Sequence, residues 1–151
     1  MTVQLLPEKT HEEKSQELLK MSLGGHAEDF MVRDVITVPP DMNAYDAIAL
    51  LLKHRISGMP VVDGDNRVIG VLSERDCLKT LVNAKYHNLP TALVKDLMST
   101  EVTTIGPKTD ILDIAKMFLE NRYRRLPVVL EDGTLAGQVS RHDLLKAVEK
   151  R

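Results

Sequence analysis

The feature of this sequence that most constrains its fold is an internal repeat. Residues 56–78 align with residues 123–145 at a constant offset of 67 positions, and eight of the 23 aligned pairs are identical. The identical pairs are Pro60/Pro127, Val61/Val128, Val62/Val129, Asp65/Asp132, Gly70/Gly137, Ser73/Ser140, Asp76/Asp143 and Leu78/Leu145. A chain of 151 residues with this pattern is expected to build one small structural unit twice.

Both copies show the same order of predicted elements: a short extended segment with a proline turn, a helix, two strands joined by a tight turn, and a last helix. Apolar residues at helical spacing indicate the first helix, and β-branched residues between turn residues indicate the strands. In the first copy the elements are predicted at residues 35–38, 44–54, 59–62, 68–72 and after Ser73. In the second copy they are predicted at residues 102–105, 111–121, 126–130, 135–139 and after Ser140.

The size of the unit predicts how the copies assemble. One copy spans about 50 residues, and a unit of that size buries too little surface to be stable alone. Two β-α-β-β-α copies packed sheet to sheet are therefore expected to share a core in one α+β, pseudo-twofold module. The predicted division is an N-terminal helical extension at 1–29, a first repeat at 30–84, a connector at 85–93 and a second repeat at 94–151.

The N-terminal extension alternates charged and apolar residues over positions 8–23. This pattern predicts a helix that ends at Gly24 and Gly25. Because it lies outside the repeats, it is expected either to pack on the module or to bridge two chains.

Composition and charge exclude several classes of function. The net charge of −2 argues against nucleic-acid binding, which requires a broad basic surface. The single cysteine, Cys77, fits a reducing compartment and a small core position. No apolar run reaches the ~18 residues of a membrane span, so a soluble, cytoplasmic protein is predicted. The five histidines lack the spacing of metal ligands, and the sequence suggests no activated nucleophile, which argues against an enzyme.

The repeated segments resemble a known family. ISGMPVVDGDNRVIGVLSERD (56–76) and YRRLPVVLEDGTLAGQVSRHD (123–143) are similar to CBS domains, named after cystathionine β-synthase. The resemblance covers roughly residues 30–148 and identifies a tandem pair, or Bateman module. It implies a homodimer of pairs and an adenine nucleotide bound between the repeats. AMP is the expected ligand, with ADP, ATP, NAD and S-adenosylmethionine as alternatives.

The recurring serine and aspartate have two interpretations. The structural one is a capping box, in which each side chain bonds the backbone amide of the other, at about 1 kcal/mol per helix. The functional one uses the helix N-terminus, which favours phosphate. The resemblance implies that Asp76 and Asp143 bind the ribose and that Ser73 and Ser140 lie by the phosphate. Both interpretations remain open from sequence.

An arginine cluster distinguishes the two copies. Arg122, Arg124 and Arg125 precede the PVV strand of the second copy, and the first copy has Ser57 and Gly58 where the second has Arg124 and Arg125. In a nucleotide-sensing member of the family, a similar His-Arg-Leu-Pro pattern meets phosphates, and arginine forks onto phosphate oxygens. The alternative is a solvated helix end, where basic residues are favourable in any case.

The remaining site residues follow from the resemblance and from position. The resemblance implies ligand contacts from first-strand threonines and from an adenine pocket before each PVV strand. These residues are Thr37, Thr104, Ile56, Ser57, Gly58, Met59, Pro60, Tyr123 and Pro127. Arg75 and His142, two residues beyond each serine, either face a phosphate or are exposed first-turn side chains.

The predicted function is regulatory. A nucleotide in the cleft is expected to favour one packing of the module, and a separate, unidentified partner protein would read that change. The alternative is a ligand-free structural or dimerisation module that regulates its partner by contact.

Overall fold

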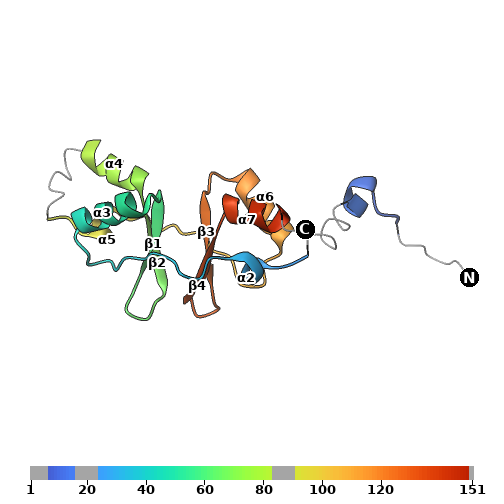
Figure 1. Cartoon of the computed structure of the whole chain (residues 1–151), viewed down its shortest axis with the longest axis horizontal. Coiled ribbons are helices and arrows are strands. Elements are labelled where there is room, and N and C mark those ends of the chain that lie inside the picture. Colours follow the sequence, from blue (N-terminus) through green and yellow to red (C-terminus); the bar gives the residue numbers. More distant parts are fainter. Residues whose placement is uncertain (1–6, 16–23, 83–90, 150–151) are drawn as a thin grey trace, which may run out of the picture.

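Two antiparallel hairpins lie at the centre of the molecule, and helices cover their outer sides (Figure 1). The structure is a computed structural model that describes residues 7–15, 24–82 and 91–149. The first repeat contains α3 (Ala44–His54), β1 (Gly58–Val62), β2 (Val68–Ser73) and α4 (Glu74–Val82). The second contains α6 (Ile111–Glu120), β3 (Arg125–Val129), β4 (Leu135–Ser140) and α7 (Arg141–Glu149). Two short helices, α2 (Ala27–Phe30) and α5 (Val94–Leu97), precede α3 and α6 respectively.

The predicted α+β repeats are confirmed, with element ends within one residue of prediction. The first extended segment is the exception, because each copy forms only a single parallel bridge there, from Val38 to Val61 and from Ile105 to Val128. Of the predicted N-terminal helix, residues 11–15 are helical. Residues 16–23 and most of the predicted connector lie outside the described residues.

The two hairpins have the same register. Gly58 pairs with Ser73 in the first repeat, and Arg125 pairs with Ser140 in the second. Each hairpin has one irregularity, at Val62 or Val129, next to the turn. This register places Ser73 and Ser140 at the open ends of their hairpins, where the last helix of each repeat begins.

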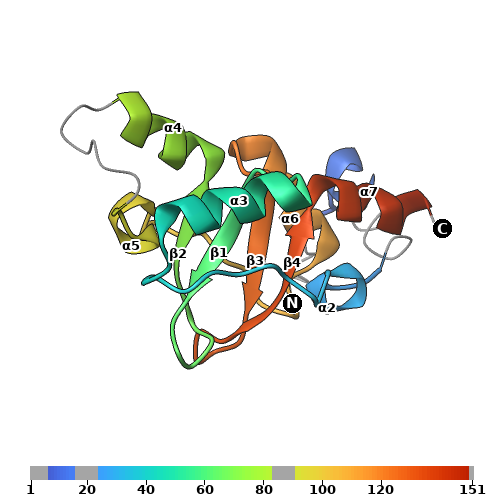
Figure 2. The same ribbon diagram turned by 60° about the vertical axis from the view of Figure 1, so that its left-hand side comes forward.

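Each repeat completes the sheet of the other. Val32, in the segment between α2 and α3, exchanges two 2.9 Å backbone hydrogen bonds with Gln138 of β4. Ser99, in the segment between α5 and α6, exchanges two 2.9 Å bonds with Val71 of β2. The chain therefore crosses between the repeats twice, and Figure 2 shows α2 on the side of β4 while α5 lies by β2.

The hydrophobic core is divided into two clusters, one between each sheet and its helices. Val94 and Leu97 of α5 pack with Met59 and Leu72 of the first repeat. Ala27 of α2 packs into the second cluster with residues such as Ile114, Leu126 and Val139. The expected shared core is thus divided into two clusters, each of which takes in a short helix that leads to the other repeat, because strand alternation turns one face of each hairpin toward the helices.

The tips of the hairpins join the repeats directly. Val68 donates its backbone N–H to Gly133 (3.1 Å), and Leu135 donates to Asn66 (2.9 Å). These bonds are related by the 67-residue offset, so they lie about the pseudo-twofold axis. Asn66 and Gly133 both have positive φ values, 61° and 88°, which the tight turns require.

We predict that Gly137→Ala destabilises the protein by about 1–3 kcal/mol. A Cβ at this position would lie 2.6 Å from Met31 Sδ and 2.8 Å from the Val32 carbonyl oxygen, so the crossing segment would have to move. Urea unfolding measures the change. Gly64→Ala is the control, because a Cβ there meets nothing within 4 Å. Equal stability of the two variants would contradict this account of the crossing.

Candidate functional site

The repeated serine and aspartate form a capping box in both copies. In the first repeat, Ser73 N donates to Asp76 Oδ2 (3.0 Å), and Asp76 N donates to Ser73 Oγ (3.1 Å). The same pair of bonds joins Ser140 and Asp143, at 2.9 and 3.1 Å. Ser73 Oγ also donates to Asp76 Oδ2 at 2.8 Å. The capping interpretation is therefore satisfied in both copies, and it uses Oδ2 of each carboxylate.

Cys77 follows Asp76 on α4 and belongs to the core of the first repeat, as predicted. Burial raises the pKa of the Cys77 thiol above its ordinary value of 9.0, and the carboxylates of Asp76 and Glu74 raise it further. The thiol is therefore protonated at neutral pH and serves as a small apolar side chain.

Arg125 crosses from the second repeat to the first. Its guanidinium donates to the Gly58 carbonyl oxygen at 2.9 Å and to Ser57 Oγ at 3.2 Å. Because Gly58 lies opposite Ser73 in the first hairpin and Arg125 lies opposite Ser140 in the second, this side chain joins the open ends of both hairpins. Arg124, its neighbour in the predicted cluster, is exposed.

The charge of Arg125 is only partly compensated. Burial lowers the pKa of Arg125, and the neighbouring charge of Arg124 lowers it further. Asp143 and Glu74 act in the opposite direction, but Arg125 forms no salt bridge with any carboxylate of the described chain. A half-buried cation thus lies between the two capping boxes with two neutral oxygens as its partners.

The residues of the expected adenine pocket lie in two environments, between the sheets and in the hydrophobic core. Pro60 and Pro127 are buried on the strand faces between the sheets, and Ser57 is half-buried beside Arg125. The side chains of Ile56 and Met59 pack in the core of the first repeat instead. Only their backbone atoms remain candidates for contact with a base.

In the second repeat, Tyr123 of the expected adenine pocket packs against the core cluster, and Thr103 contacts its hydroxyl. Tyr123 forms a 2.7 Å hydrogen bond through its hydroxyl with Thr103 Oγ1, whereas the neighbouring Thr104 is exposed. Thr37 is half-buried at the matching place of the first repeat. Since two threonines stand side by side at 103–104, the repeat alignment alone could not reveal the one next to Tyr123.

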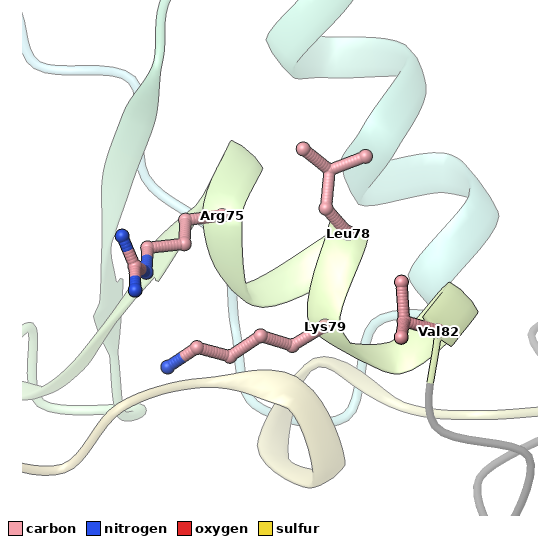
Figure 3. A pocket seen from close by; sticks show the side chains of 4 residues that line it. All are labelled: Arg75, Leu78, Lys79 and Val82. Atoms are coloured by element: carbon pink, nitrogen blue, oxygen red, sulfur yellow. The ribbon is translucent and has the colours of Figure 1, made fainter.

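Arg75 lies on α4 in a surface groove of about 440 Å³, lined also by Leu78, Lys79 and Val82. Arg75 and Lys79 extend their charged ends toward the same side of the helix (Figure 3). Lys79 lies four residues after Arg75, a spacing that places the two side chains on one face of α4. His142, the counterpart of Arg75, is exposed at the start of α7.

Two kinds of feature are absent from the described ranges. No group of three or more His, Cys, Asp or Glu side chains there could hold a metal ion. No helix in the same ranges is long and apolar enough to cross a membrane.

Comparison with protein families identifies the repeats. The CBS domain matches twice, over residues 27–83 and 94–150. The chain belongs to the CBS domain family. Its two matches in tandem make it a CBS pair, as the sequence predicted.

The CBS pair is similar to proteins of different lengths. It is 32% identical to the uncharacterized protein MJ1426 of Methanocaldococcus jannaschii, over 87% of this chain and 97% of that protein. It is 35% identical to inosine-5'-monophosphate dehydrogenase of Korarchaeum cryptofilum, but spans only 23% of that enzyme. Among solved structures, CBSX2 of Arabidopsis thaliana in complex with AMP matches with a TM-score of 0.76 and 31% identity, over 84% of this chain and 98% of that one.

We predict that Ser140→Ala lowers the free energy of unfolding by about 1 kcal/mol, because the Asp143 amide loses its capping oxygen. Ser73→Ala is expected to cost a similar amount. Chemical denaturation measures both. Ser140→Thr is the matched control, since it keeps an accepting hydroxyl. If Ala and Thr at position 140 gave the same stability, the serine hydroxyl would have no capping role.

Proposed function

We propose that this CBS pair is a regulatory sensor that binds an adenine nucleotide, AMP foremost, between its two repeats. The observation that carries the proposal is the half-buried guanidinium of Arg125 between the two capping boxes. A buried charge costs free energy unless it is paired. A phosphate group would supply that pairing through charge-assisted, forked hydrogen bonds.

The surrounding residues suit the rest of a nucleotide. The N-termini of α4 and α7 favour negative charge. Oδ1 of Asp76 and of Asp143 takes no part in the capping boxes, so each aspartate can accept a ribose hydroxyl while it still caps its helix. The AMP complex of CBSX2, at 31% identity, supports an adenine ligand for this fold. ADP, ATP, NAD and S-adenosylmethionine are the alternatives to AMP.

The proposed mechanism is a shift between two arrangements of the repeats. Arg125 now bonds Ser57 and Gly58 of the other repeat. A phosphate that draws Arg125 toward itself weakens those bonds and changes how the hairpin ends meet. Because the ligand prefers one arrangement, it shifts the population toward it. A separate partner protein reads the outcome, and the chain itself performs no catalysis.

A homodimer is the second part of the proposal. Leucines at matched positions of the two repeats are exposed on the outer helices: Leu78 (60%) and Leu145 (67%), and Leu52 (72%) and Leu119 (87%). Exposed apolar groups of this kind mark interaction surfaces. Since the pseudo-twofold symmetry presents the same set twice, a second copy of this chain is the occupant that fits.

A ligand-free module that acts by contact is the other candidate. The observation in its favour is that both serine–aspartate pairs satisfy their own hydrogen bonds as helix caps. In that case the pairs stabilise α4 and α7 and need no ligand.

We predict that AMP raises the thermal midpoint of the wild-type protein. A ligand at a hundred times its Kd that binds only the folded state adds ~2.7 kcal/mol. The shift is expected to be lost in Arg125→Met, which removes the cation, and in Asp143→Ala, which removes the ribose acceptor. Differential scanning fluorimetry with AMP, ADP, ATP, NAD and S-adenosylmethionine gives the readout.

The matched controls are Lys116→Met and Asp113→Ala, which alter an exposed cation and an exposed carboxylate on α6 of the second repeat. Each variant is compared with its own ligand-free midpoint, so loss of stability is not mistaken for loss of binding. Absence of any shift in the wild type would favour the ligand-free module.

We predict that the double variant Leu78→Glu/Leu145→Glu is monomeric under conditions in which the wild type is dimeric. Charge at these positions opposes burial of the helix faces against a second copy. Light scattering coupled to size-exclusion chromatography measures the mass. Leu130→Glu is the control, because Leu130 is also exposed (45%) but follows β3 at the hairpin turn. A monomeric wild type would refute the dimer.

A further inference from the structure

Gln138 of β4 carries a buried polar atom that has no partner. Its side-chain oxygen, Oε1, is covered by protein and forms no hydrogen bond with any of the described residues. A buried acceptor without a donor costs folding free energy, and such groups are rare in folded proteins. The hydrogen bonds that Gln138 forms with Val32 in the sheet use its backbone N–H and carbonyl only. They therefore give the side-chain oxygen no partner.

The register shows which face of the hairpin carries this side chain. The neighbours Gly137 and Val139 face the core of the second repeat. Alternation therefore places Gln138 on the opposite face, two residues from Ser140. Its cross-strand partner is Pro127. Directly paired side chains of an antiparallel ladder lie about 5 Å apart, so Gln138 lies beside the predicted adenine-contacting proline and along the same face as the capping serine.

The first repeat lacks this acceptor. Val71 is the counterpart of Gln138, two residues before Ser73 and opposite Pro60. The prolines, serines and aspartates around these two positions are the same in both repeats. Besides the difference at Arg125 and Gly58, the two sites therefore differ at this side chain, which is an amide in the second repeat and an apolar group in the first.

We infer that Gln138 is a specificity-determining residue, whose Oε1 accepts a hydrogen bond from the 6-amino group of adenine bound at the second repeat. This inference rests on the proposed nucleotide-binding function. A purine with an amino group at position 6 supplies the donor that Oε1 lacks, and a purine with hydrogen there leaves it unpaired. The Val71 site has no such requirement and does not discriminate between the two bases.

The covered position of Oε1 has a consequence for binding. A base reaches this atom only by entering between the two sheets. Recognition of the amino group is therefore coupled to a change in how the repeats pack, which is the change that the proposed sensor requires.

The test compares wild type, Gln138→Val and the reciprocal Val71→Gln. Calorimetry measures the affinities for AMP and for purine riboside 5'-monophosphate, which differs from AMP only in lacking the amino group. The wild type is expected to bind AMP about tenfold more tightly at the second repeat, the difference that one hydrogen bond to a buried acceptor makes. Gln138→Val is expected to lose this preference while its affinity for the analogue stays within about twofold.

A second readout needs no ligand. Gln138→Val removes an unpaired buried acceptor, so its denaturation midpoint without nucleotide is expected to rise above that of the wild type. Val71→Gln adds such an acceptor to the first repeat, and its midpoint is expected to fall. A merely structural glutamine would give a lower midpoint in Gln138→Val.

The outcomes separate this inference from the proposed function. If AMP binds the wild type and Gln138→Val keeps the same preference for AMP over the analogue, the recognition role inferred for Gln138 is wrong. The proposed sensor function is then unaffected. If both nucleotides lose affinity equally in Gln138→Val, the residue supports the fold only. If neither nucleotide binds the wild type, the proposed function fails, and this inference fails with it.

Discussion

The exchange of segments between the repeats is the constraint on which the rest of the structure depends. The backbone pairs Val32/Gln138 and Val71/Ser99 each add the first segment of one repeat to the sheet of the other. Each core cluster is completed by the short helix, α2 or α5, that leads into the opposite repeat. Neither hairpin could keep its apolar face and its edge covered if the other were removed. The pair therefore folds as a unit although its core is divided.

This arrangement fixes the relation between the two serine–aspartate elements. Both lie at the same end of the paired hairpins, and Arg125 reaches from the open end of the second hairpin to Ser57 and Gly58 at the open end of the first. A duplicated unit can thus build a site that is nearly symmetric but chemically unequal. Arginine faces Gly58 across the repeats, and glutamine faces away from the core where the first repeat has valine. These differences, rather than the shared motif, give the proposed site its charge and its selectivity.

The sequence predicts much of this because repeated local signals agree with the fold. The turn residues, the apolar periodicity and the Ser-x-x-Asp caps each lead to the observed element. The crossing of the segments could not be predicted, since the residues before the two repeats carry the same pattern and either could pair with either sheet. The partners of Arg125 and Thr103, and the covered oxygen of Gln138, depend on tertiary contacts that no local pattern encodes.

The hydrogen bonds between the hairpin tips determine how the two halves can move. Asn66, Val68, Gly133 and Leu135 tie the turns together about the pseudo-twofold axis, whereas Arg125 provides the side-chain tie at the opposite end. Loss of the Arg125 hydrogen bonds alone would leave every backbone bond between the tips in place. The open ends of the hairpins, where α4 and α7 begin, are therefore held to each other by a side-chain contact that can be exchanged without breaking any backbone bond at the tips.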